Sequence, residues 1–345
     1  MPSRLALVAA GATLVSLACV TTGQADSRPS PRPPGGSCSS SVTITGYSDA
    51  LDKTTFDGTF VGNLSALSVM PDGDIAAVSD RSSLFTLDKR TLRPRSVRPL
   101  VDENGAALDS EGLAVDRDGT RLISSETEPS VRRYDRHGRI RERLPVPARL
   151  AVAPAGRATP NATFEGLTLL PGGRTLLASM EGPLSGDDGI VRLQTWQRPA
   201  LGRPFNAGAQ YGYRLDGGLA VSDVTATPDG RLLVLERGYT GGVGNTVRLY
   251  LADLSGADDT SGTENLTGQR EIRLVHKTLL ADLVNCPSLG APAKQPQPNP
   301  LLDNIEAVAV TGQRADGAME LTLASDDNQS ASQITRLYRL TVRRL

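Results

Sequence analysis

Residues 165–181 read EGLTLLPGGRTLLASME: an acid, an apolar run, a turn at Pro-Gly-Gly, a second apolar run and a second acid. Two antiparallel strands joined at such a turn bring the first residue of one strand beside the last residue of the other. The pattern recurs at 65–80, 111–126, 223–236 and 306–326, with starts 46 to 83 residues apart. A unit that returns at this spacing indicates a repeat architecture.

The residues that open and close the five copies are almost all acids. They are Ser65 and Asp80, Glu111 and Glu126, Glu165 and Glu181, Asp223 and Glu236, and Glu306 and Asp326. Nine of these ten are carboxylates, whereas Asp and Glu together make up only 38 of the 345 residues. Because repeated hairpins lie side by side, we expect the acids to converge at one end of the domain.

Further strand-like segments follow each hairpin, and we find no amphipathic helix of ordinary length. Four strands per repeat make the blade of a β-propeller. The last repeat ends one strand short, and the segment SVTITGY at 41–47 can supply that strand and close the ring. We therefore predict an all-β propeller of five four-stranded blades. Six blades are the alternative, although the Pro-rich segment 284–303 is a poor source of four strands.

The first strand of each hairpin alternates small and larger residues. Gly112 and Ala114 are small, for example, whereas Leu113 and Val115 are larger. Small residues on one face allow neighbouring strands to approach closely around a propeller axis. The pattern predicts that these strands are innermost and that the acids lie at the mouth of the central channel.

The chain begins with the features of an export signal. Arg4 precedes a mostly apolar run at 5–20, and Gly23-Gln24-Ala25 offers a cleavage site between small residues. Secretion is therefore expected, and a lipoprotein anchored through Cys19 is the alternative. The expected segments are a signal peptide at 1–25, a Pro-rich disordered linker at 26–41 and one propeller domain at 42–345.

Cleavage at that site leaves two cysteines, Cys38 and Cys286. An even number in an exported protein favours a disulfide, with two unpaired thiols as the alternative. No later stretch is apolar enough to predict a transmembrane segment. The formal net charge of −1 gives no overall attraction to nucleic acid, so nucleic-acid binding is not expected.

Carboxylates gathered in a channel-sized space raise one another's pKa unless cations neutralise them. Oxygen ligands without nearby Cys or His suit a hard cation, so Ca²⁺ is expected and Mg²⁺ is the alternative. Each acid taken singly could equally accept backbone hydrogen bonds or pair with a local Arg. The expected metal ligands are Asp80, Glu126, Glu181, Asp223, Glu236, Glu306 and Asp326.

Other catalytic motifs are missing from the sequence. The two histidines, His137 and His276, lie in strand-and-turn segments that mark them as packing or surface residues. No G-x-S-x-G motif supports a Ser-His-Asp esterase. The glycines at 241–244 lack the Lys-Ser/Thr pair of a phosphate-binding loop.

Several of the acidic motifs resemble those of a bacterial domain family described as having the esterase-like activity of phytase. The motifs are Ser79-Asp80-Arg81, Ser110-Glu111-Gly112, Phe164-Glu165-Gly166-Leu167 and Asn304-Ile305-Glu306. The resemblance covers roughly 45–340 and implies an exported propeller linked to hydrolysis of esters or phosphate esters. By motif it carries over Asp80, Arg81, Glu111, Glu165, Glu181 and Glu306. The fourth repeat departs from the pattern, with Asp223-Val224 in place of Glu-Gly.

These observations favour a metal-assisted hydrolase of a phosphate or carboxylic ester. Glu165 or Glu111 is the expected general base, and Arg81 and Arg237 are expected to contact substrate oxygens. The expected partner is a small anionic or ester substrate, and the protein is expected to be a monomer. The alternative is a non-catalytic secreted propeller that binds a ligand or protein and uses cations as structural elements.

Overall fold

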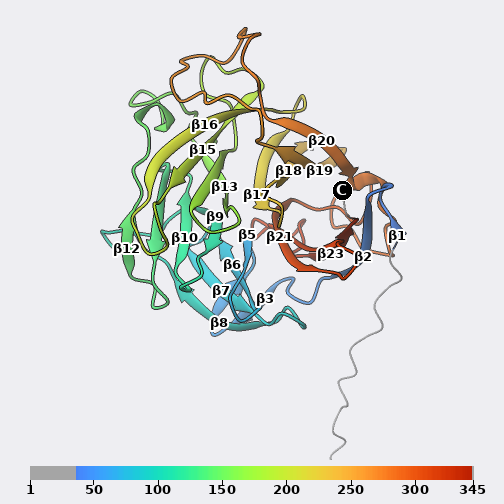
Figure 1. Cartoon of the computed structure of the whole chain (residues 1–345). Coiled ribbons are helices and arrows are strands. Elements are labelled where there is room, and N and C mark those ends of the chain that lie inside the picture. The colour runs from blue at the N-terminus through green and yellow to red at the C-terminus, as the bar shows by residue number, and fades with distance from the viewer. Residues whose placement is uncertain (1–35, 344–345) are drawn as a thin grey trace, which may run out of the picture. The chain divides into compact units, whose positions relative to one another are not determined.

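Each acid-flanked hairpin forms the two inner strands of a sheet, as seen in the computed structural model, which describes residues 36–343 (Figure 1). In four of the sheets two further strands pair outward in chain order. Blade 1 contains β5 (Leu64–Val69), β6 (Ile75–Ser79), β7 (Ser83–Leu87) and β8 (Pro94–Pro99). Blade 2 contains β9 (Ser110–Val115), β10 (Arg121–Ser125), β11 (Ser130–Tyr134) and β12 (Ile140–Arg143). Blade 3 contains β13 (Phe164–Leu169), β14 (Thr175–Met180), β15 (Ile190–Gln197) and β16 (Asn206–Arg214). Blade 4 contains β17 (Ala220–Ala226), β18 (Leu232–Thr240), β19 (Gly244–Asp253) and β20 (His276–Asp282).

Blade 5 is built from both ends of the described chain. Its strands are β21 (Ile305–Gln313), β22 (Met319–Ser325), β23 (Leu337–Val342), β2 (Val42–Ser48) and the two-residue β1 (Gly36–Ser37). Strand β2 pairs with β23 in antiparallel register, from Val42 opposite Val342 to Ser48 opposite Leu337. The prediction that the N-terminal strand completes the last blade is therefore confirmed.

The inner strands of successive blades contact one another, and β21 returns to contact β5, so the ring is closed. Five blades are confirmed, because segment 284–303 contributes no strand within the described residues. That segment includes most of the short 3₁₀ helix η2 (Leu283–Asn285); a second, η1 (Ala148–Leu150), follows blade 2. A small hairpin, β3 (Thr54–Phe56) and β4 (Thr59–Val61), lies between the closing strand and blade 1.

The small residues of the inner strands lie where the blades meet. A Cβ added to Gly112 would lie 2.4 Å from the backbone oxygen of Glu165, and one added to Gly166 would lie 2.4 Å from the backbone nitrogen of Val224. Neither distance leaves room for a side chain, so glycine permits the close approach of neighbouring inner strands. The predicted role of the small positions is confirmed at both glycines.

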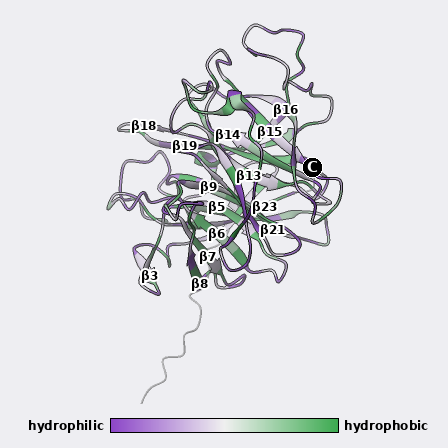
Figure 2. Cartoon of the chain, turned by 90° about the vertical axis from the view of Figure 1, so that its left-hand side faces the viewer, coloured by the Kyte–Doolittle hydropathy of each residue, from purple (hydrophilic) through white to green (hydrophobic). Residues whose placement is uncertain are grey.

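Apolar side chains fill the spaces between the sheets, and Figure 2 shows hydrophobic residues along the sheet strands. Between blades 2 and 3 the largest of them is Trp196, which is fully buried with its ring against that of Phe164. The Trp196 Nε1 donates to the backbone oxygen of Pro145 at 2.7 Å. Burial of these apolar surfaces is the main source of the fold's stability.

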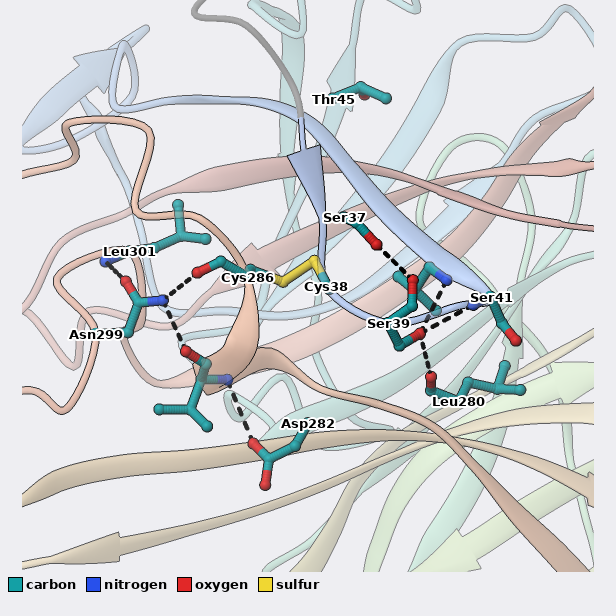
Figure 3. The surroundings of a disulfide bond; sticks show 12 residues. Ser37, Cys38, Ser39, Ser41, Thr45, Leu280, Asp282, Cys286, Asn299 and Leu301 are labelled. Carbon is teal, nitrogen blue, oxygen red and sulfur yellow. Dashed lines mark hydrogen bonds between the residues drawn. A yellow bond between two sulfur atoms is a disulfide. The ribbon is translucent and has the colours of Figure 1, made fainter.

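Cys38 and Cys286 form a disulfide that ties the closing strand to the segment after η2 (Figure 3). Nearby, the Ser39 hydroxyl donates to the backbone oxygen of Leu280, which adds a polar contact with blade 4. Residues 36–41 were expected in the disordered linker, but β1 and Cys38 belong to the folded unit. The predicted signal peptide, Cys19 and the rest of the linker lie outside the described residues. Within 36–343, no helix has the length and apolar character needed to span a membrane.

Candidate functional site

All five inner hairpins share an irregularity of pairing at their acidic end. The inner strand carries an extra residue there, a β-bulge. The equivalent pairs on the mouth side of the bulge are Leu64–Ser79, Ser110–Ser125, Phe164–Met180, Val221–Glu236 and Ile305–Ser325. The residue after each member of these pairs therefore occupies the same place in every blade.

This register defines two rings of five residues at the channel mouth. The inner ring consists of Ser65, Glu111, Glu165, Ser222 and Glu306. The second ring consists of Asp80, Glu126, Glu181, Arg237 and Asp326. The prediction placed Asp223 and Glu236 in these rings, and the register corrects it by one residue in blade 4. A shift of one residue turns a side chain to the other face of its strand.

Asp223 occupies the place of Gly166 in blade 3 and joins two blades. One carboxylate oxygen accepts from its following amide, Val224 N, at 2.8 Å, and the other accepts from Val308 N of β21 at 2.8 Å. Both oxygens are thus engaged by backbone donors. The structure places Asp223 as a link between blades 4 and 5.

Glu236 likewise lies away from the rings, in a polar network with the outer strands. Its carboxylate accepts from the Tyr213 hydroxyl at 2.7 Å, from Asp216 N at 2.9 Å and from Lys277 Nζ at 2.5 Å. The side chain is fully buried but fully partnered. Glu236 is therefore a neutralised acid between blades 3 and 4.

The number of residues in each copy is the sequence signal that could have predicted this register. The first two copies, 65–80 and 111–126, have 16 residues, whereas 223–236 has only 14. Extending the fourth copy by one residue at each end gives 222–237, which has the length of the first two copies. Matching by residue type selected the acids and missed the shift.

Three carboxylates in blade 2 lie close enough together to hold one metal ion. Oxygen atoms of Asp109, Glu111 and Glu126 all lie within 4.8 Å of one another. Glu126 N donates to the backbone oxygen of Asp109 at 3.0 Å, and the Thr127 hydroxyl donates to the Asp109 carboxylate at 2.9 Å. We call Asp109, Glu111 and Glu126 the blade 2 triad. Sequence reasoning missed Asp109 because it precedes the hairpin pattern.

One oxygen of the triad lacks a hydrogen-bond donor. Glu126 is only 4% exposed, and its Oε1 is buried without a hydrogen bond. A buried oxygen without a donor is costly, since it has lost water and gained nothing. The donor set is three carboxylates, which is the ligand chemistry that Ca²⁺ and Mg²⁺ prefer. These residues fit a hard divalent cation.

Burial and mutual repulsion raise the pKa values of the mouth carboxylates. Burial is the main cause for Glu165 and Glu111, whose pKa values lie well above the usual range, and each is raised further by neighbouring acids. Burial, with Glu181 and Asp109 nearby, raises the pKa of Glu126 to about 8. Burial raises the pKa of Asp80 to about 6, against the opposing effect of Arg81. The mouth therefore favours protons or cations over free negative charge.

Arg237 brings a positive charge into the second ring. Its Nη2 lies 2.6 Å from Glu306 Oε1 and 3.8 Å from Glu181 Oε1. The Arg237 Nε is buried without a hydrogen-bond partner. Glu306 also accepts from Asn304 Nδ2 at 2.9 Å. This side of the mouth thus holds the positively charged guanidinium of Arg237, whose Nε is a donor without a hydrogen bond.

The second predicted arginine lies at the rim. Arg81 pairs loosely with Asp80, Nε to Oδ1 at 3.6 Å, and its side chain is 67% exposed. An exposed side chain can turn toward a ligand at the mouth, whereas Arg237 is held in place. Asp326, in blade 5, is buried, and one of its oxygens accepts from Asn328 N at 2.7 Å.

Sequence and structure comparisons relate the chain to known proteins. The Phytase-like family model, described as esterase-like activity of phytase, matches residues 59–329. No curated protein sequence matches the chain. A luciferin-regenerating enzyme structure is similar at 13% identity and a TM-score of 0.43, covering 82% of this chain and 80% of that one. A streptogramin B lyase structure is similar at 10% identity and a TM-score of 0.37, covering 82% of this chain and 94% of that one.

Proposed function

Because the chain belongs to the Phytase-like family, we propose that it is an exported, metal-assisted hydrolase of a phosphate or carboxylic ester. The observation that supports this proposal most is the blade 2 triad, with the unpartnered Oε1 of Glu126. The triad residues hold the cation, Ca²⁺ or Mg²⁺. A bound divalent cation supplies positive charge that attracts an anionic group and polarises an ester bond.

Glu165 is the general base in this proposal. It lies in the inner ring of the blade beside the triad, and its carboxylate is buried among the other acids. Glu111 was the other candidate, but its oxygen belongs to the triad. In its ionised form Glu165 accepts a proton from the attacking water as the oxygen–phosphorus or oxygen–carbon bond forms. The ester bond then breaks, and the leaving oxygen takes a proton, from protonated Glu165 or from water, to depart as the alcohol.

Arg237 orients the substrate from the opposite side. Its Nε is an unused donor, and its Nη2 is held by Glu306, so the guanidinium is fixed relative to the ring. Guanidinium groups recognise phosphate and carboxylate oxygens through paired donors. Arg81, exposed at the rim, makes a second contact with a bound anion.

Turnover of aryl esters tests the proposal. Purified protein should release nitrophenol from nitrophenyl phosphate or nitrophenyl acetate when Ca²⁺ or Mg²⁺ is present. Release should fall to the uncatalysed rate in excess chelator and return when the cation is restored. Cation binding without turnover of either substrate would refute the hydrolase and favour a non-catalytic secreted propeller that uses the cation structurally.

A further inference from the structure

The channel mouth contains a second group of unpartnered oxygens, in blade 1. Asn63 is 0% exposed, and its side-chain oxygen Oδ1 is buried without a hydrogen bond. Asp80 Oδ1 is also buried without a hydrogen bond. The two side chains face each other, since Asn63 Nδ2 lies 3.4 Å from Asp80 Oδ2. Two buried oxygens without hydrogen bonds thus lie on adjacent side chains, and Asp80 Oδ1 has only the loose ion pair with Arg81 Nε at 3.6 Å.

The backbone of blade 1 repeats the frame of the blade 2 triad. Asp80 N donates to the backbone oxygen of Asn63 at 3.1 Å, as Glu126 N donates to that of Asp109 at 3.0 Å. Asn63 therefore corresponds to Asp109, and Asp80 corresponds to Glu126. The inner-ring member of blade 1 is Ser65, where blade 2 has Glu111.

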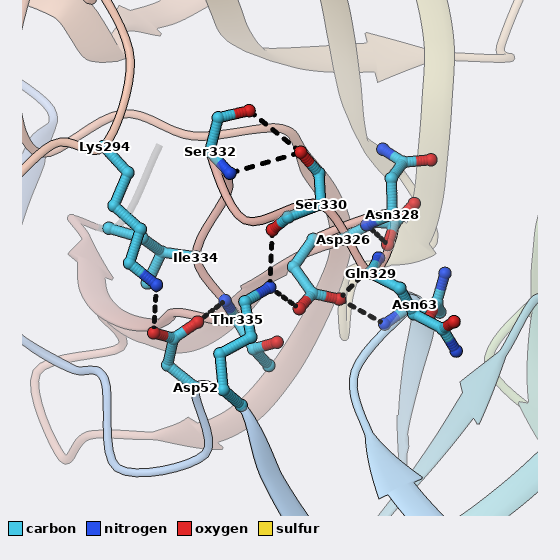
Figure 4. Close-up of polar contacts among 12 residues, drawn as sticks. Asp52, Asn63, Lys294, Asp326, Asn328, Gln329, Ser330, Ser332, Ile334 and Thr335 are labelled. Atoms are coloured by element: carbon cyan, nitrogen blue, oxygen red, sulfur yellow. Dashed lines mark hydrogen bonds and ion pairs between the residues drawn. The ribbon is translucent and has the colours of Figure 1, made fainter.

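Asn63 is held firmly in its position. Its backbone has φ 57°, a left-handed conformation that Asn tolerates better than most residues. Its backbone nitrogen donates to Asp327 Oδ1 at 3.1 Å, and Lys53 bonds the other oxygen of Asp327, within the polar group drawn in Figure 4. The backbone of Asn63 is thus fixed, and its side chain lies toward Asp80 through the contact of Nδ2 with Asp80 Oδ2.

We propose that Asn63 and Asp80 bind a second divalent cation, separate from the one at the blade 2 triad. An amide oxygen and a carboxylate oxygen are both ligands of Ca²⁺, and water molecules complete its shell of six to eight oxygens. The cation satisfies the two oxygens that the protein leaves without donors. This inference concerns cation binding and does not require that the protein be a hydrolase.

Titration calorimetry with CaCl₂ tests the second site. The wild-type protein, freed of metal by chelator, should bind two Ca²⁺ per chain. Asn63→Gly keeps the left-handed backbone and removes the oxygen, so this variant should bind one. Asp80→Asn, which keeps the size of the side chain, should also lose one equivalent. Glu126→Gln should lose the other, and Asn63→Gly combined with Glu126→Gln should bind none.

Asn161→Gly is the matched control, because Asn161 is exposed and has a similar backbone φ of 54°. It should still bind two Ca²⁺. Two equivalents in both Asn63→Gly and Asp80→Asn, or a single wild-type equivalent lost only with Glu126→Gln, would overturn the proposal. Circular dichroism of each variant in chelator identifies any that fails to fold. If Asn63→Gly or Asp80→Asn fails to fold, the number of Ca²⁺ bound by the other variant tests the site. Absence of hydrolysis with two bound Ca²⁺ would refute the proposed activity and leave this site intact.

Discussion

Two groups of acids lie near the same end of the propeller, and the protein supplies partners to them unequally. Between blades 3 and 4, Glu236 and Asp216 share Lys277, which lies 4.1 Å from the ring centre of Tyr250. In the blade 2 triad, Glu126 has an oxygen with no partner. The outer strands of blades 3 and 4 supply Lys277 and the hydroxyls of Tyr213 and Tyr250 to Glu236 and Asp216. They supply no such group to the blade 2 triad. The fold supplies Arg237 to Glu306 at the mouth, but it leaves an oxygen of the blade 2 triad without a hydrogen bond.

The largest expected effect separates the two groups by activity. Glu165→Gln keeps the shape of the side chain but cannot accept a proton, so hydrolysis should fall roughly a hundredfold or more. The melting temperature in chelator should barely change, because burial already favours the neutral form of Glu165. Steady-state kinetics and thermal melting measure the two quantities.

Asp223→Asn is the control for Glu165→Gln. Asp223 accepts from Val308 N and lies outside the rings, so its variant should lower stability and leave turnover per folded molecule unchanged. If Glu165→Gln instead lowers stability with normal turnover, Glu165 is a structural acceptor like Asp223.

The second prediction concerns cation binding to the mouth. A ligand that binds only the native state raises the free energy of unfolding by about 2.7 kcal/mol at a hundredfold excess over Kd. Thermal melting should therefore show a higher midpoint with millimolar Ca²⁺ than with chelator. An unchanged midpoint would mean that the mouth acids are satisfied without a cation.

The third prediction concerns the neutralised network. Glu236→Gln removes the charge that faces Lys277, while Asp216 remains as its partner, so we expect a loss of about 2 kcal/mol in the free energy of unfolding. Denaturant titration measures it. The loss should be the same with and without Ca²⁺, and a loss that disappears on adding Ca²⁺ would place Glu236 in the cation site.

The last prediction concerns pH. In chelator, the folded pKa values of Glu126, about 8, and Asp80, about 6, exceed their ordinary values of 4.5 and 3.8. The folded state then holds protons that the unfolded state releases, so this stabilisation is full below about pH 4 and is lost as pH rises to about 8. The melting temperature in chelator should fall by a few degrees between pH 5 and 8. A rise over this range would contradict the raised pKa values.

The repeated hairpin was sufficient to predict the propeller, because the spacing of acids, turns and apolar runs reflects local strand pairing. The missing last strand likewise predicted ring closure by the N-terminal segment, and the cysteine count predicted the disulfide. These features depend on pattern and number. They do not depend on which face a particular residue occupies.

The composition of the mouth was harder to predict, because it depends on register. In blade 4 the acids Asp223 and Glu236 are each one residue from the ring positions, which Ser222 and Arg237 occupy. The preceding position, which supplies Asp109 and Asn63, lies outside the repeated pattern and is brought to the mouth by a backbone hydrogen bond. Neither feature has a signature in residue type alone.

The composite blade has a consequence for the order of synthesis. Strand β2 is made near the beginning of the chain, and its partner β23 is made last, so the ring stays open until every other blade has been produced. Until then strands β2 and β22, which both pair with β23, offer unpaired backbone groups to any neighbouring chain. Truncation after Ser325 would make that exposure permanent, and aggregation of the shortened protein is the expected outcome.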